Sequence, residues 1–192
     1  SACRRAVQRG EGSVAAASFA AIWQVPMCRG PHGLGVELAR SVLALPSLGP
    51  EARAATLIRY GNALRLTGQP GAAAEAMHAA LALSRAAGDR RGMAAAQAGS
   101  GMVLTSLEGR YDEAAVLLQA ALAGAREVGD MLTEGLALDA WGLVLADTGQ
   151  TAACLQVWTQ AAALQRAAAW RRGAGQPGGP CCSERSSSIV LA

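Results

Sequence analysis

The chain contains no lysine, since all 17 of its basic side chains are arginine. A P-loop nucleotide site of the usual kind and a Schiff-base enzyme both need lysine, so both are excluded. Aromatic residues make up only 4% of the 192 residues, and the net charge is +3. Because single-stranded nucleic acids are usually bound by basic side chains interleaved with aromatic ones, we expect no nucleic-acid partner.

Histidine is also scarce, with only His32 and His78 in the chain. We expect His32 to be exposed in a loop, and His78 to face solvent on a helix that also carries Glu75. No HExxH, GxSxG or Walker A motif occurs, and the segment 99–101 (GSG) lies inside a helical pattern rather than on a strand-to-helix turn. We therefore predict that the protein is not an enzyme and has no cofactor and no small-molecule substrate.

Cysteine occurs five times, and no two cysteines have the CxxC spacing of a zinc site, so no metal site is predicted. Cys154 occupies a small apolar position of a helical pattern and is expected in the core. Cys181 and Cys182 lie near arginines, which leaves two interpretations open: an S-acylation site or plain exposed thiols. The free cysteines favour a cytoplasmic location, and no apolar run reaches the roughly 18 residues of a transmembrane segment.

Two stretches of the chain have nearly the same sequence. Gly68–Asp89 is GQPGAAAEAMHAALALSRAAGD, and Gly109–Asp130, 41 residues later, is GRYDEAAVLLQAALAGAREVGD. A third copy begins 40 residues further on, at Gly149. Such self-similarity is typical of a repeat protein. Because alanine dominates the copies and favours helix, we predict an all-α fold.

Each copy predicts a pair of helices. The expected first helices are Pro50–Thr67, Arg90–Leu107 and Met131–Thr148, and the expected second helices are Pro70–Ala87, Asp112–Val128 and Thr151–Ala169. The glycines between them, Gly68, Gly109 and Gly149, suit the left-handed residue that ends a helix. Gly88-Asp89 and Gly129-Asp130 are expected to do two things, because the glycine ends one helix and the aspartate caps the next.

With these positions in place, each copy resembles a tetratricopeptide repeat over Pro50–Ala169. The Leu-Gly step of that family corresponds to Tyr60-Gly61, Ser100-Gly101 and Trp141-Gly142, and the large apolar position of the second helix to Met77, Leu118 and Trp158. The period is longer than the family norm of about 34 residues. In this longer period, the repeat is similar to the tetratricopeptide subclass found in polarity scaffolds that bridge G-protein α subunits and in rapsyn-like scaffolds.

The resemblance implies a right-handed α-solenoid of three helix hairpins plus a degenerate N-terminal helix, over residues 34–170. Val36–Leu45 is predicted to be the second helix of an earlier, degenerate repeat. Residues 1–33 are expected to be a poorly ordered segment; a targeting peptide and a stray amphipathic helix with Phe19, Ile22 and Trp23 on one side are the alternatives. Residues 171–192, rich in Gly, Pro and Ser, are expected to be a disordered tail.

In this family the first helices line a concave groove that holds a partner peptide or helix. The resemblance places in that groove the residues Ile58, Asn62, Arg65, Met102, Thr105, Asp139, Leu143 and Asp147. We therefore predict a non-catalytic scaffold for protein–protein interaction. Two alternatives stay open: a regulatory or oligomerisation segment of a larger enzyme or transcription regulator, and a truncated fragment of a longer array. The last helix, with Trp158, Leu164 and Trp170, is expected to leave an apolar end face exposed.

Overall fold

The computed structural model of the chain describes residues 2–172, except residues 24, 26, 28, 29 and 108, and gives no side-chain surroundings for residues 165 and 168–172. Within this part of the chain every regular element is an α-helix and no strand occurs, which confirms the all-α prediction. The helices are α1 Ala2–Gln8, α2 Gly12–Ile22, α4 His32–Leu43, α5 Pro50–Leu66, α6 Pro70–Ala86, α7 Arg90–Leu104, α8 Tyr111–Glu127, α9 Met131–Asp147 and α10 Thr151–Arg172.

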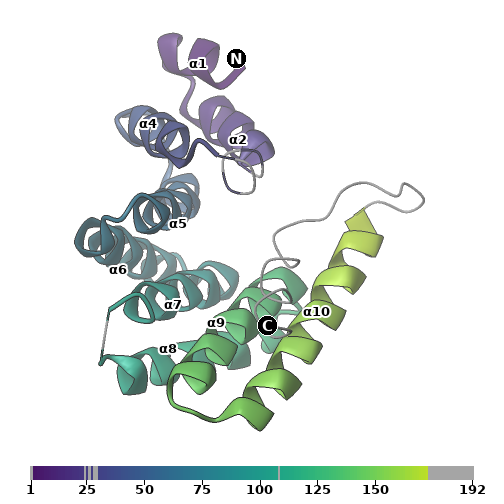
Figure 1. Ribbon diagram of the computed structural model, residues 1–192. Helices are drawn as coiled ribbons and strands as arrows, with labels where there is room; N and C mark the ends of the chain where they lie inside the picture. The colour runs from purple at the N-terminus through teal and green to yellow at the C-terminus, as the bar shows by residue number, and fades with distance from the viewer. Residues whose placement is uncertain (1, 24, 26, 28–29, 108, 173–192) are drawn as a thin grey trace.

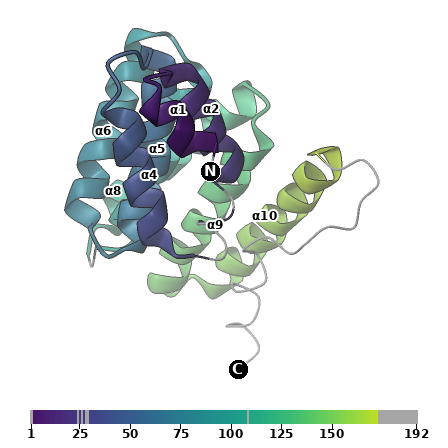
Figure 2. The same cartoon turned by 90° about the horizontal axis from the view of Figure 1, so that it is seen from above.

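From α4 to α10, each helix packs on the helix that follows it in the chain. The helices are stacked in chain order along a curved line from α1 to α10 (Figure 1). Every second helix also contacts the next but one, in the series α2, α5, α7 and α9, whereas the described helices α4, α6, α8 and α10 make no comparable contacts with one another. The stack is therefore tighter on the side of α5, α7 and α9, which we call the inner side. Figure 2 views the same stack from above.

Glycine ends most of the helices where the sequence predicted it. Gly68 has φ of 75°, and its N–H donates to the Arg65 carbonyl at 3.1 Å while the Gln69 N–H donates to the Leu64 carbonyl at 2.9 Å. This is the bonding pattern of a left-handed glycine cap. Residues with an L side chain rarely adopt the positive φ that this cap requires. Gly88, Gly129 and Gly149 share this bonding pattern and have positive φ. Gly109 also has a positive φ, but α7 ends at Leu104, earlier than the predicted Leu107, so this glycine lies beyond the helix end. The hairpin boundaries thus follow from the chemistry of single residues.

Aspartate begins two of the inner helices, as predicted. The side chain of Asp89 accepts a hydrogen bond from the Gly92 N–H at 2.9 Å. Asp130 accepts from the Leu132 and Thr133 N–H groups at 3.2 and 3.4 Å, and also from the Thr133 hydroxyl at 2.9 Å. Each carboxylate thereby satisfies N–H groups that have no partner inside the helix.

The three aligned Gly positions of the first helices make the same packing contact. A Cβ atom added at Gly61 would lie 2.8 Å from Met77 Cε, and one at Gly101 would lie 2.6 Å from Leu118 Cγ. A Cβ atom added at Gly142 would likewise meet the indole of Trp158. Each glycine therefore admits the large apolar side chain of its own second helix, so the backbones of a pair approach closely. Met77 and Leu118 are fully buried as a result.

Residues 1–33 were expected to be poorly ordered, and the structure corrects this expectation for most of them. Two helices, α1 and α2, occupy the segment, and Cys3, Ala15 and Phe19 are buried. They cover the apolar side of α4, in one cluster with residues such as Val42. Phe19 is buried beside half-buried Ile22 and Trp23, as the amphipathic-helix interpretation required. An apolar partner surface on α4 makes this segment fold.

Hydrogen bonds to Ser47 hold the start of α2 against the segment between α4 and α5. The Ser47 hydroxyl donates to the Gly10 carbonyl at 2.6 Å and accepts from the Gly12 N–H at 3.0 Å. His32, expected in an exposed loop, instead begins α4 and is half-buried. The helix Val36–Leu45 was correctly predicted but starts earlier than expected. The structure thus places one more helix pair, α2 and α4, ahead of the three recognised in the sequence.

At the other end, α10 continues to Arg172, slightly past the predicted limit of Ala169. The predicted tail from residue 173 onward, with Cys181 and Cys182, lies outside the described residues, as does the side chain of Trp170. Cys154 is buried, as predicted, and burial raises the pKa of its thiol. In α10, Leu155 is 43% exposed, and Trp158 and Leu164 are half-buried.

Candidate peptide-binding face

The eight predicted groove residues lie on or next to the three inner helices. Ile58, Asn62 and Arg65 belong to α5, Met102 and the C-cap Thr105 to the end of α7, and Asp139, Leu143 and Asp147 to α9. Within each helix the spacing of three or four residues puts them on one side. All eight are at least partly accessible, and Leu143 is 47% exposed. Because α5 contacts α7 and α7 contacts α9, we treat the eight residues as one surface, the inner face.

On α5, the inner face contains polar atoms that are buried without a partner. Neither the side-chain oxygen of Asn62 nor the Nε of Arg65 has a hydrogen-bond partner among the described residues, although both atoms are shielded from solvent. Burial lowers the pKa of Arg65, because removing a guanidinium from water disfavours its charged form. Among the described residues, no carboxylate forms an ion pair with Arg65. The Nε of Arg65 has therefore lost its hydration without gaining a hydrogen bond, while the residue as a whole stays partly accessible.

Arg59 belongs to the same group, and the sequence analysis missed it. It lies one turn before Asn62, burial lowers its pKa, and its Nη1 donates to the Ala55 carbonyl of its own helix at 2.8 Å. No ion pair of Arg59 occurs in the part of the chain that the structure describes. In the sequence, the available signal was a second arginine near Asn62. Only the fold shows that both guanidinium groups are partly removed from water and that, among the described residues, neither forms an ion pair with a carboxylate.

On α7 the inner face is small and apolar. Met102 is half-buried and packs on the cluster that contains Leu118 and Leu138. The Thr105 hydroxyl donates to the Met102 carbonyl at 2.8 Å, so within the chain it caps the helix end. Ala98, one turn before Met102, is buried. The middle of the inner face thus offers a thioether and little polar chemistry, a surface that adapts well to apolar side chains.

On α9 the inner face is acidic around an exposed leucine. Asp139 and Asp147 lie four residues before and after Leu143, on the same side of the helix. Asp147 is exposed and is the last residue of α9. A carboxylate at a helix C-terminus is opposed by the helix dipole, at a typical cost of about 0.3–1 kcal/mol. An exposed large apolar side chain and an unfavourably placed carboxylate therefore occur together here.

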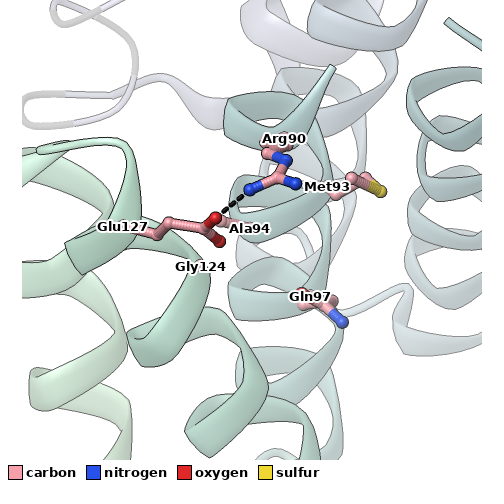
Figure 3. Close-up of a pocket in the computed structure, with 6 residues that line it drawn as sticks. All are labelled: Arg90, Met93, Ala94, Gln97, Gly124 and Glu127. Atoms are coloured by element: carbon pink, nitrogen blue, oxygen red, sulfur yellow. Dashed lines mark hydrogen bonds and ion pairs between the residues drawn. The ribbon is translucent and has the colours of Figure 1, made fainter. Parts of the chain in front are cut away.

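A separate shallow groove lies between α7 and α8 (Figure 3). It has a volume of about 370 Å³ and is lined by Arg90, Met93, Ala94, Gln97, Gly124 and Glu127. Arg90 and Glu127 form an ion pair across it, while Met93 and Gln97 point away from that pair (Figure 3). None of the eight predicted residues lines this groove. Its charged groups already satisfy each other, so it makes a weaker candidate than the inner face.

Other kinds of site were searched for among the described residues. They contain no group of three or more His, Cys, Asp or Glu side chains arranged to hold a metal ion. His78 is exposed on α6, as predicted. In the same part of the chain, no helix combines the length and the apolar character needed to cross a membrane.

No protein-family model matches this sequence, and a search of curated proteins finds no match. The tetratricopeptide resemblance therefore rests on the residues quoted above and on the packing they produce. The inner face is the surface that combines unpartnered buried polar atoms with an exposed large apolar side chain, Leu143.

Proposed function

We propose that the chain is a right-handed, tetratricopeptide-like α-solenoid that acts as a non-catalytic scaffold and holds a partner peptide or helix on its inner face. One observation carries this proposal. Within the part of the chain that the structure describes, buried polar atoms of Asn62 and Arg65 on α5 have no hydrogen-bond partner, while Leu143 is exposed on α9. Both helices contact α7 between them. A partner can bond the accessible parts of the first two side chains and cover the third.

The energetics of these groups favour binding. A buried polar group without a hydrogen bond costs about 1–3 kcal/mol, and that cost disappears when the side chain turns the shielded atom toward a partner that supplies the bond. Covering an exposed leucine side chain adds further stabilisation, about 25 cal/mol for each Å² of apolar surface removed from water. The inner face combines an unsatisfied polar group and an exposed leucine on two helices that both contact α7. Its free energy therefore falls more on binding a partner than that of a uniformly solvated helix surface.

Binding is proposed rather than catalysis because of the side chains that the inner face contains. They are asparagine, arginine, methionine, threonine, leucine, isoleucine and aspartate, and the one hydroxyl, that of Thr105, is bonded to the backbone of its own helix. A nucleophile next to a general base, the usual arrangement for covalent catalysis, is not among them. Carboxylates, guanidinium groups and apolar side chains on successive helices suit the recognition of an extended or helical segment.

Panning a random peptide display library against the full chain tests the proposal. We expect enriched peptides whose binding is lost in Leu143→Glu, because a charge then replaces an exposed apolar side chain of the inner face. The matched control is Val116→Glu on α8, since Val116 is 68% exposed and lies outside the inner face. If no peptide is enriched, or if both variants bind every enriched peptide like the wild type, the inner face is not the binding surface.

A second candidate, an oligomerisation or regulatory segment of a larger protein, is favoured by α10. Leu155 of this helix is 43% exposed, and Leu164 is only half-buried. Light scattering after size exclusion distinguishes the two functions: a concentration-dependent dimer that Leu155→Glu dissociates would support this candidate, and a monomer at all concentrations would contradict it.

A further inference from the structure

We propose that the inner face has two charged poles and selects a partner segment with an acidic end, an apolar centre and a basic end. The acidic end lies on α5 against Arg59, Asn62 and Arg65, and the basic end lies on α9 against Asp147. This inference rests on the proposed binding function and specifies the chemistry of the partner. The reasons come from the two poles and from the distance between them.

The cationic pole on α5 has no neutralising anion among the described residues. Arg59 and Arg65 both lose water of hydration on folding, and within the described residues neither meets a carboxylate. A guanidinium binds a carboxylate through two parallel N–H donors, so Glu or Asp of a partner suits Arg65. Asn62, which is partly accessible on the same side of α5, can bond the backbone of the same segment through its amide. Together these groups recognise an acidic residue and the backbone next to it.

The anionic pole on α9 suits a basic side chain of the partner. Asp147 is exposed at the C-terminus of its helix, where the carbonyl groups add to the negative potential. Asp139 lies two turns earlier on the same side of the helix, with Leu143 between the two. A lysine or arginine of the partner neutralises Asp147, while its aliphatic stem covers Leu143.

The fold sets the separation of the two ends of the partner. Packed helices lie about 8–10 Å apart, so α5 and α9, on either side of α7, are separated by roughly 16–20 Å. An extended segment rises about 3.3 Å per residue and a helix about 1.5 Å, so the opposite charges are about 5–6 residues apart in a strand or 11–13 in a helix. Met102, between the poles, meets the apolar centre of the segment. An anionic polymer such as RNA fits poorly, because its charge would continue across Asp147.

Three synthetic peptides of identical composition test the inference, measured by fluorescence anisotropy against the full chain. One has acidic and basic blocks at opposite ends of an apolar centre, one alternates the charges, and one places both charge types in the centre. We expect the block peptide to bind about tenfold more tightly than the other two, the effect of one well-placed charge pair. Raising the salt concentration weakens the block peptide most.

Charge reversal on the protein completes the test. Arg65→Glu and Asp147→Arg are each expected to weaken the block peptide about tenfold, the size of one well-placed charge pair, and to leave the alternating peptide nearly unchanged. Arg85→Glu and Glu75→Arg are the matched controls, because both side chains are exposed on α6, outside the inner face. Arg65→Met removes the positive charge without introducing a negative one, and it guards against a folding defect in Arg65→Glu.

The outcomes separate this inference from the proposed function. Equal affinity for the three peptides, or equal effects of the reversals and their controls, overturns the two-pole arrangement. If library peptides still depend on Leu143 in that case, the binding function stands and only the charge order is wrong. Tight binding of an RNA oligomer that competes with the block peptide would overturn the inference in favour of a general anion site.

Discussion

The indole of Trp158 on α10 lies over the backbone of Gly142 on α9, where a Cβ atom would meet it. Its Nε1 also donates a hydrogen bond at 3.2 Å to the carbonyl of Asp139, one turn earlier in α9. Gly61 with Met77 and Gly101 with Leu118 repeat the steric part of this relationship. The hairpins are therefore held by a large side chain seated on a glycine. That contact decides which substitutions the fold tolerates.

Gly142→Ala is expected to destabilise the chain. The added methyl group collides with the indole of Trp158, and such overpacking costs about 1–3 kcal/mol, against which the better helix propensity of alanine returns about 1. We expect a net loss of up to about 2 kcal/mol in the free energy of unfolding, measured by urea denaturation followed by circular dichroism. Gly71→Ala is the control, since a Cβ there meets nothing within 4 Å, and it should be neutral or stabilising. Equal stability of the two variants would contradict the packing of α9 on α10.

Asp130→Ala is expected to lower stability through the loss of a helix cap. The carboxylate accepts from the N–H groups of Leu132 and Thr133 at the start of α9, and such caps contribute about 1 kcal/mol. Asp130→Asn keeps the accepting oxygen and should retain most of the stability. The comparison fails if asparagine is as destabilising as alanine, because the charge, and not the cap, would then be the stabilising element.

Stability is expected to fall at alkaline pH, in part through Cys154. Burial raises the pKa of its thiol above the ordinary value of 9.0 in the folded chain. The contribution is complete below pH 9.0 and is lost as the pH rises toward the raised pKa, because only the unfolded chain releases the proton easily. Urea midpoints between pH 8 and 10.5 should therefore decline more steeply in the wild type than in Cys154→Ala. Parallel declines would show that the thiol ionises as easily in the folded chain.

The same burial should protect Cys154 from alkylation. The thiolate is the reactive species, so a buried thiol with a raised pKa reacts slowly. Iodoacetamide labelling followed by peptide mass spectrometry should modify Cys154 only in denaturant. Rapid labelling under native conditions would contradict the packed position of Cys154 at the start of α10.

Arg65→Met should separate stability from binding. In the free chain, methionine replaces a desolvated cation without an ion pair, so the free energy of unfolding should stay equal or rise by about 1 kcal/mol. The same variant should lose affinity for the block peptide. A variant that is destabilised and binds normally would show that Arg65 is a structural residue, and would remove it from the inner face.

Much of the fold could be predicted because the local signals are strong. A glycine followed by aspartate specifies a helix end and a helix start within two residues, so the boundaries at positions 88–89 and 129–130 were placed correctly. The alignment of Gly61, Gly101 and Gly142 predicted equivalent positions, and the structure shows that they make equivalent contacts. The N-terminal segment was misjudged, because its helices are stabilised by apolar residues of α4, some 20 to 35 residues away in the chain. A local pattern carries no information about such a partner.

By itself, the amino-acid sequence determined the helical class, the period of the hairpins and the residues that end them, since these depend on backbone conformation over a few neighbouring positions. Only the tertiary structure decided the electrostatic state of the inner face. Whether Arg59, Asn62 and Arg65 are satisfied depends on which groups surround them, and those groups come from helices far apart in the chain. The sequence does not show whether an arginine has a counter-ion. The packing of α5 against α7 and its other neighbours buries Arg59 and Arg65, and within the described residues neither forms an ion pair.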